Sequence, residues 1–300
     1  MSEEATLSES RRDTGNERPI VTEREIVEGL RALGFDGSRP VIVHASLRSF
    51  GWVEGGAATV CRALLSACGT VVAPAFTDDV CRVPAPPGLL RPHNAVLVAD
   101  GWEQFDAALA RAEPFTRSTP INRELGRIPE TLRREFPHAR SSHPSTSFIA
   151  AGPRAEQVVG AVRLDHPLGP IEAVEQLDGD VLLLGVGHDK DTAIHLAEQR
   201  LGRSRFYRYA KWSEGVWMEL PNIPGESDGF DAIEPLLVAD TREGDIGTCR
   251  ARAVRVRRVL AAAEEMILAD SAALLCNDAD CERCRAAHRQ RLAWLARGGT

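Results

Sequence analysis

A histidine and a glutamate stand three residues apart near the end of the segment VLLLGVGHDKDTAIHLAE, residues 181–198. His195 and Glu198 would share one face of a helix, so their side chains can touch. Histidine exchanges a proton near neutral pH, and a neighbouring carboxylate fixes the imidazole tautomer and stabilises the imidazolium. The pair can therefore act as a general base with its orienting carboxylate. The alternative is an ordinary contact on a surface helix.

The residues before this pair indicate where it lies in the fold. Residues 181–184 form a continuous apolar run, which is typical of a buried strand. Gly185 and Gly187 then allow a tight turn or the close approach of a ligand to the backbone. Open α/β sheets bind their ligands just beyond the carboxyl ends of strands. We therefore expect His195 and Glu198 at the edge of a central sheet.

The rest of the chain alternates apolar strands with amphipathic helices. Strands are predicted at residues 40–43, 70–73, 148–151, 205–212, 216–220 and 249–256, and helices at 22–34, 57–67, 102–112, 122–136, 230–238 and 259–275. The sequence contains no internal repeat and no linker. It predicts an α/β protein with one domain at residues 20–270, a disordered N-terminal tail at 1–19 and a C-terminal helical tail at 271–300.

Two further histidines stand at the ends of predicted elements. His44 follows the apolar run of residues 40–43, and His143 lies in the polar loop RSSHPSTS, residues 140–147, which leads into a strand. Histidines at the carboxyl ends of neighbouring strands can meet in one site. Each can equally be a structural histidine whose ring is hydrogen-bonded to the backbone.

The charge balance argues against one class of partner and favours another. The chain has 43 acidic and 36 basic residues, a formal charge of −7, which argues against nucleic acid and suits a cationic ligand. No apolar run approaches the roughly 20 residues of a membrane span, and the N-terminus is too polar for a signal peptide. We therefore expect a cytoplasmic protein with no membrane partner.

Three of the seven cysteines cluster near the C-terminus. The pattern Cys276-x4-Cys281-x2-Cys284-x3-His288 has the ligand types and the close spacing of a structural zinc site. A disulfide framework is not expected, because the cysteines are odd in number and the chain is long. The alternative to zinc is a helical tail whose thiols are simply reduced. A zinc ion here would hold the tail and take no part in catalysis.

Four segments, taken in order, resemble the aminoglycoside 3-N-acetyltransferase family. They are VIVHASLRSFGWVEGG (residues 41–56), TPINRELGRIPETLRREFPHARSSHPSTSFIAAG (119–152), DGDVLLLGVGHDKDTAIHLAE (178–198) and GDIGTCRARAV (244–254). The patterns HxSL, RSxHPxxS and TxxHxAE occur in series, and the resemblance covers roughly residues 20–270.

The resemblance implies a single three-layer α/β/α domain with a central mixed sheet. It also implies an enzyme that moves an acetyl group from acetyl-coenzyme A to an amine, usually the 3-amino group of 2-deoxystreptamine in an aminoglycoside. In that reaction the catalytic residues would be His195 as the general base, Glu198, which would orient it or bind the substrate ammonium, and His44 beside the coenzyme loop. The residues expected to bind the coenzyme are Ser46, Leu47, Arg48, Ser49, Val53, Gly55, Gly56, Arg117, Ser118 and His143, with the glycine amides suited to a phosphate.

A polycationic substrate needs carboxylates at the cleft. The predicted contacts are Asp78, Asp191, Asp231 and Glu198. Two positions depart from the family's pattern: residues 169–171 read Gly-Pro-Ile where Ser-Pro-Leu is common, and Thr116 stands where aspartate is common. These departures keep a different amine open as the substrate. A rival of another class is a zinc-stapled binding protein whose cleft is idle, and the oligomeric state is left open.

Overall fold

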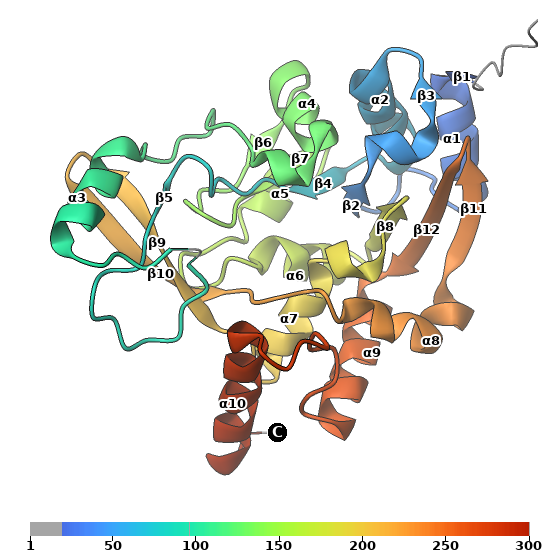
Figure 1. Ribbon diagram of the computed structural model, residues 1–300. Coiled ribbons are helices and arrows are strands. Elements are labelled where there is room, and N and C mark those ends of the chain that lie inside the picture. The colour runs from blue at the N-terminus through green and yellow to red at the C-terminus, as the bar shows by residue number, and fades with distance from the viewer. Residues whose placement is uncertain (1–19, 96, 300) are drawn as a thin grey trace, which may run out of the picture.

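The computed structural model describes residues 20–95 and 97–299, so the tail predicted at residues 1–19 lies outside the described residues. A seven-stranded mixed sheet with the order β11-β12-β8-β2-β4-β7-β6 forms the centre (Figure 1). Its strands are β2 (Val41–Ala45), β4 (Val71–Pro74), β6 (Ala139–Arg140), β7 (Phe148–Ala151), β8 (Asp180–Leu184), β11 (Arg242–Ile246) and β12 (Cys249–Arg255). The strand β2 is parallel to both β4 and β8, whereas β12 and β7 are antiparallel to their neighbours. The predicted α/β class with a mixed sheet is confirmed.

Helices cover both faces of this sheet and make three layers (Figure 1). Alternate residues of a strand point to opposite faces. Val43, Leu182 and Leu184 accordingly join one core cluster, while Ile42 and Leu183 join the other. The first cluster includes residues of α1 (Glu23–Ala32), α2 (Gly56–Cys68) and α4 (Arg127–Glu135). The second includes residues of α5 (Ala155–Val159), α6 (Gly169–Gln176), α7 (Ala193–Arg200) and α9 (Val256–Ala269).

A second, three-stranded sheet stands beside the central one (left in Figure 1). It consists of β5 (Arg82–Val83), β9 (Phe206–Ser213) and β10 (Val216–Ile223), and α3 (Trp102–Arg111) packs on it. The predicted hairpin of β9 and β10 turns at Gly215, whose φ is +67°. A short parallel pair, β1 (Ile20–Val21) and β3 (Trp52–Val53), completes the strands of the described residues.

Three predicted helices differ in extent or continuity from what the sequence suggests. The helix expected at residues 122–136 is broken at Gly126, whose φ of +83° lies outside the helical region, so a short 3₁₀ turn, η2 (Arg123–Leu125), precedes α4. The helix expected at 259–275 begins at Val256 and ends at Ala269. The helix expected at 230–238 consists of three short pieces, η4 (Phe230–Ile233), α8 (Glu234–Leu237) and η5 (Val238–Asp240).

The last helix, α10 (Glu282–Ala296), packs against the segment that follows α7. Gln290 accepts a hydrogen bond from the Arg205 amide at 2.8 Å and donates one to the Arg205 carbonyl at 3.0 Å. Arg291 is buried and donates to the Leu201 carbonyl at 3.0 Å. In the described part of the chain, no helix has the length and apolarity needed to cross a membrane.

Candidate active site

A chain of three buried side chains starts at His195 on α7. His195 Nδ1 lies 2.7 Å from Glu198 Oε2, and the other oxygen of Glu198 accepts a hydrogen bond from Arg203 Nε at 3.0 Å. The Glu198 and Arg203 side chains are both fully buried. Arg203 Nη1 in turn donates to the Ser271 carbonyl at 3.0 Å. The ion pair therefore holds the carboxylate in one position behind the imidazole.

This arrangement selects the tautomer of His195. A carboxylate paired with a guanidinium can only accept hydrogen bonds, so Nδ1 carries the proton and Nε2 keeps its lone pair. Nε2 has no hydrogen-bond partner among the described residues, and it is not one of their buried unpaired atoms. The ring itself packs edge-on against Phe230, with 4.8 Å between the centroids. In its neutral form His195 thus presents the lone pair of Nε2 toward accessible space.

A second histidine–carboxylate pair precedes the first on the same segment. His188, in η3 (His188–Lys190), lies with Nδ1 3.1 Å from Asp191 Oδ2, and both side chains are buried. The second oxygen of Asp191 accepts a hydrogen bond from the Ala193 amide at the start of α7, at 3.0 Å. His188 is not among the site residues predicted from the sequence. Its spacing of three from Asp191 equals that of His195 from Glu198 and was the available signal.

His44 lies at the carboxyl end of β2, beside β8, and is 7% exposed. Its pKa is lowered to about 4, mainly by burial; the carboxylate of Asp191 opposes this shift and the neighbouring His188 adds to it. The imidazole is therefore neutral near pH 7. Its Nε2 is buried and has no hydrogen-bond partner in the described residues. His44 therefore adds a neutral polar group close to the His188–Asp191 pair.

Glycines let two loops close over the end of β8. Gly185 has a φ of +65°, and a Cβ there would lie 2.0 Å from Ser49 Oγ. A Cβ on Gly187 would lie 2.5 Å from a carboxylate oxygen of Asp231. On the other side, the Ser46 amide donates to the Leu184 carbonyl at 2.9 Å. The predicted coenzyme loop, which includes η1 (Leu47–Phe50), therefore packs directly on the strand that leads to His195.

The predicted coenzyme glycines stand at the start of α2. Gly55 is the N-cap and Gly56 the first helical residue, both with positive φ, and no side chain caps this end. A Cβ on Gly55 would lie 2.5 Å from Thr59 Oγ1, whereas a Cβ on Gly56 would meet nothing within 4 Å. The free amides of a helix N-terminus suit an anion such as a phosphate. Val53, in β3, is buried behind this turn.

The other predicted coenzyme contacts differ in exposure. Arg48, Arg117 and Ser118 are exposed, and their contact with a coenzyme stays a prediction. His143 is fully buried, and its Nδ1 accepts hydrogen bonds from the amides of Ser145 and Thr146 at 3.2 and 2.9 Å. Burial lowers the pKa of His143 to about 4. The His143 ring therefore stabilises the conformation of its own loop through these two hydrogen bonds.

The predicted substrate carboxylates are unequal in availability. Asp78 is paired with Arg208 at 2.7 Å and accepts a hydrogen bond from Ser145 at 3.1 Å. Asp191 is buried with both oxygens used, as described above. Asp231 is exposed, and its Oδ1 accepts from the Asp189 amide at 3.1 Å. Of the three aspartates, Asp231 is the one whose carboxylate is open to a ligand.

Asp231 also lines a pocket of about 600 Å³ between η4, the end of α9 and residues 270–275. Asp228 and Asp270 line the same pocket, together with the apolar side chains of Met266 and Leu274. Phe230 lies between Asp231 and Gly229 in the sequence and contacts the His195 ring. The residue that packs on the His195 ring therefore stands in the sequence between the pocket residues Asp228 and Asp231.

The comparisons with known proteins converge on one family. The model of the aminoglycoside 3-N-acetyltransferase family matches residues 42–268, which is more than half of the chain. The chain belongs to the aminoglycoside 3-N-acetyltransferase family. Among curated members, aminoglycoside N(3)-acetyltransferase IV of Salmonella sp is 35% identical over 178 residues, 58% of this chain and 57% of that protein. The SPbeta prophage-derived aminoglycoside N(3')-acetyltransferase-like protein YokD of Bacillus subtilis is 28% identical over 260 residues, 82% of this chain and 92% of that protein.

Solved structures of the aminoglycoside 3-N-acetyltransferase family share this architecture. The apoenzyme of AAC(3)-IVa superposes with a TM-score of 0.73 at 29% identity and covers 92% of this chain and 100% of that one. A histidine-to-alanine variant of the same enzyme, solved with a gentamicin, gives 0.72 at 28% identity, with 92% and 99% covered. AAC-IIIb, solved with CoASH, is similar in fold, with a TM-score of 0.67, 23% identity and coverage of 82% and 96%. The acetyltransferase fold implied by the sequence motifs is confirmed.

Proposed function

We propose that this protein transfers an acetyl group from acetyl-coenzyme A to an amino group of an aminoglycoside, with His195 as the general base. The observation that carries the proposal is the chain from His195 through Glu198 to Arg203, which directs Nδ1 to the carboxylate and leaves Nε2 accessible. Membership of the family supports both the reaction and the substrate class. The 3-amino group of 2-deoxystreptamine is the acceptor that the family's description favours.

The reaction requires a proton acceptor because only a free amine attacks a thioester. Nε2 of His195 takes a proton from the amine as its nitrogen bonds to the acetyl carbon. Glu198 stabilises the resulting imidazolium, and Arg203 keeps Glu198 in place. The carbon–sulfur bond then breaks, and coenzyme A leaves as a thiolate that takes up the proton. The products are the N-acetylated substrate and free coenzyme A, so atoms and charge balance.

The coenzyme and the amine would approach this base from different loops. The amides at Gly55 and Gly56 suit the coenzyme phosphates, and the loop of Ser46–Ser49 packs on the end of β8. His44 is neutral near pH 7 and can act there only as a hydrogen-bonding group. The cationic substrate would lie on the side of Asp231, where the exposed carboxylates gather. The proposal includes the cytoplasm as the location, because free thiols persist in a reducing compartment.

An assay of thiol release from acetyl-coenzyme A, run against a panel of aminoglycosides, tests this function. Release that depends on the aminoglycoside, with acetylation mapped to the 3-amino group by NMR, is the expected result. Release with simple amines only would support the second candidate, a related acetyltransferase of another amine, which the departures at Thr116 and residues 169–171 favour. No release with any amine, together with ligand binding, would support an idle cleft.

A further inference from the structure

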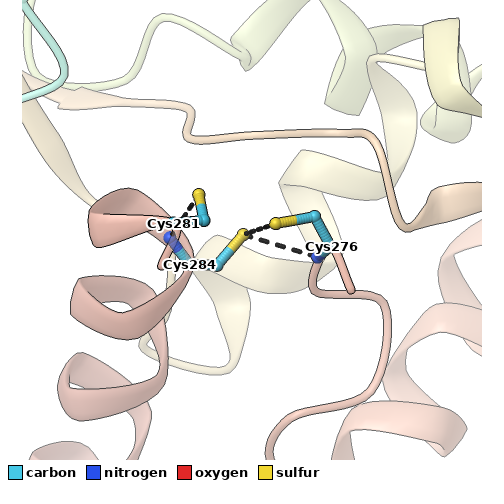
Figure 2. A group of neighbouring side chains, drawn as sticks. All are labelled: Cys276, Cys281 and Cys284. Carbon is cyan, nitrogen blue, oxygen red and sulfur yellow. Dashed lines mark hydrogen bonds between the residues drawn. The ribbon is translucent and has the colours of Figure 1, made fainter. Parts of the chain in front are cut away.

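The three C-terminal cysteines come together in space (Figure 2). The Sγ atoms of Cys276, Cys281 and Cys284 all lie within 4.8 Å of one another, and those of Cys276 and Cys284 are 3.1 Å apart. Within the described residues, this is the one group of three or more His, Cys, Asp or Glu side chains that could hold a metal ion. The other four cysteines are buried elsewhere in the chain.

The sulfur positions are compatible with a tetrahedral thiolate site. Zinc–sulfur bonds of about 2.3 Å in tetrahedral geometry place the sulfurs about 3.8 Å apart. That spacing falls between the 3.1 Å of the shortest pair and the 4.8 Å limit of the group. An ion would therefore need only small shifts of side chains that already converge. A disulfide would pair two of the three thiols and leave the third without a partner, so it does not explain why all three converge.

Backbone amides already point at two of these sulfurs. Cys281 is the N-cap of α10, and its Sγ accepts a hydrogen bond from the Cys284 amide at 3.5 Å. The Cys284 sulfur accepts from the Cys276 amide at 3.4 Å (Figure 2). Amides directed at a ligand atom stabilise its charged form and fix its orientation. The backbone is thus arranged for thiolates at these positions.

We propose that Cys276, Cys281 and Cys284 bind one zinc ion through their thiolates, with a solvent molecule as the fourth ligand. Each thiol loses its proton when the metal binds. The spacing in the sequence predicts His288 as the fourth ligand, but His288 is not a member of the cluster. Its Nε2 lies 2.9 Å from Ser271 Oγ.

The proposed ion would fix the segment that supports His195 from behind. Ser271, five residues before Cys276, accepts the hydrogen bond of Arg203. Residues 274 and 275 pack so closely on Gly229 that a Cβ there would lie 2.2 Å from the Leu275 carbonyl oxygen. Arg283 on α10 also pairs with Glu226 at 2.6 Å. The metal site is therefore structural: the ion would hold this segment in place and would take no part in the transfer of the acetyl group.

Metal analysis of the full-length protein, purified without chelator, tests the proposal. We expect about one zinc per chain, and about none in the Cys281→Ser and Cys284→Ser variants. Cys68→Ala, which removes a thiol from the core, is the matched control and should keep the zinc. His288→Ala should keep it as well. Loss of zinc in the His288→Ala variant would contradict solvent as the fourth ligand. Wild-type protein without zinc would contradict the whole site.

A second measurement does not depend on the variants folding. Wild-type protein treated with chelator and then given cobalt(II) should show the visible absorption of a tetrahedral cobalt–thiolate centre. The chelator should also lower the melting temperature of wild-type protein, and added zinc should restore it. A chelator without effect on melting, or a Cys276–Cys284 disulfide found by mass spectrometry in protein kept under reducing conditions, would overturn the proposal. Neither readout involves acetyl transfer, so this test is independent of the proposed function.

Discussion

At the scale of single residues, the tautomer and the position of the His195 ring depend on two other side chains. Glu198 selects its tautomer, and Arg203 selects the position of Glu198. In the proposed mechanism Glu198 and Arg203 therefore act as positioning residues for His195. The sequence indicated the first pair through the spacing of three in a helix. It gave no indication of Arg203, because that residue lies beyond the end of α7 and returns to Glu198 only in the folded chain.

Replacement of His195 by alanine should lower turnover by about 10²–10⁴-fold, because the amine loses its proton acceptor. Binding of acetyl-coenzyme A should change little. Steady-state thiol release and coenzyme titration are the measurements. His138→Ala is the matched control, since His138 is exposed and its ring hydrogen-bonds to the Phe136 carbonyl, at 2.9 Å. Wild-type turnover in His195→Ala would remove His195 from the mechanism.

Two buried histidines should make the fold sensitive to acid. His44 and His143 have pKa values lowered to about 4 by burial, against about 6.5 in an unfolded chain. Between pH 6.5 and 4 the unfolded chain binds more protons than the folded one, so stability falls as the pH falls through this window. The difference in pKa corresponds to on the order of 3 kcal/mol for each histidine at the acid end.

Urea unfolding at pH 7.5 and pH 4.5 measures this loss. His143→Asn keeps an oxygen that can accept from the Ser145 and Thr146 amides, yet it does not titrate. The variant should therefore lose less stability than wild-type protein between the two pH values. An equal loss in both proteins would show that His143 is not the group responsible.

At the scale of elements, the sequence predicted the buried parts better than the connections. The apolar run of residues 181–184 and the alternation around Gly215 each indicated the element that the structure has. Residues 122–136 are amphipathic throughout, but the left-handed φ at Gly126 breaks the helix there. The short strand β6 is two residues long and has no pattern to detect. His188 was missed because its short 3₁₀ turn has no apolar face to mark it.

The start of α2 offers a test of the coenzyme loop. Gly56→Ala should raise the Michaelis constant for acetyl-coenzyme A more than it lowers turnover, because the new Cβ points into open space where a phosphate would approach. The matched control is Gly215→Ala in the β9–β10 turn. Gly215 has a similar positive φ, and a Cβ there also meets nothing within 4 Å. Both variants should thus carry the same backbone strain of about 1–2 kcal/mol. Equal Michaelis constants for acetyl-coenzyme A in the two variants would therefore contradict coenzyme binding at Gly56.

At the scale of the whole molecule, the charge of −7 should steer a cationic substrate. At about 0.15 M ionic strength the Debye length is about 8 Å, so distant acids affect encounter more than binding. Carboxylates in contact are screened less, and each removal should cost on the order of 1–3 kcal/mol. Rising salt should therefore raise the Michaelis constant of the aminoglycoside with much less effect on turnover.

Two variants separate contact from overall charge in this salt series. Asp231→Asn should flatten the response, because Asp231 is the exposed predicted carboxylate beside the pocket. Asp106→Asn removes the same charge from an exposed position on α3, at the second sheet, and should leave the response nearly unchanged. A Michaelis constant of the aminoglycoside that does not change with salt would contradict substrate binding by exposed carboxylates. It would favour a neutral or anionic amine as the substrate.

The hydrogen bond from Arg203 to the Ser271 carbonyl has a consequence for how the protein is made. During synthesis α7 leaves the ribosome well before residue 271 does. His195 and Glu198 precede Arg203 on one short segment, but the guanidinium behind them lacks its acceptor until residue 271 has been translated. The nascent polypeptide therefore completes the support behind His195 only after residue 271 has emerged, and a chain truncated before that residue never completes it.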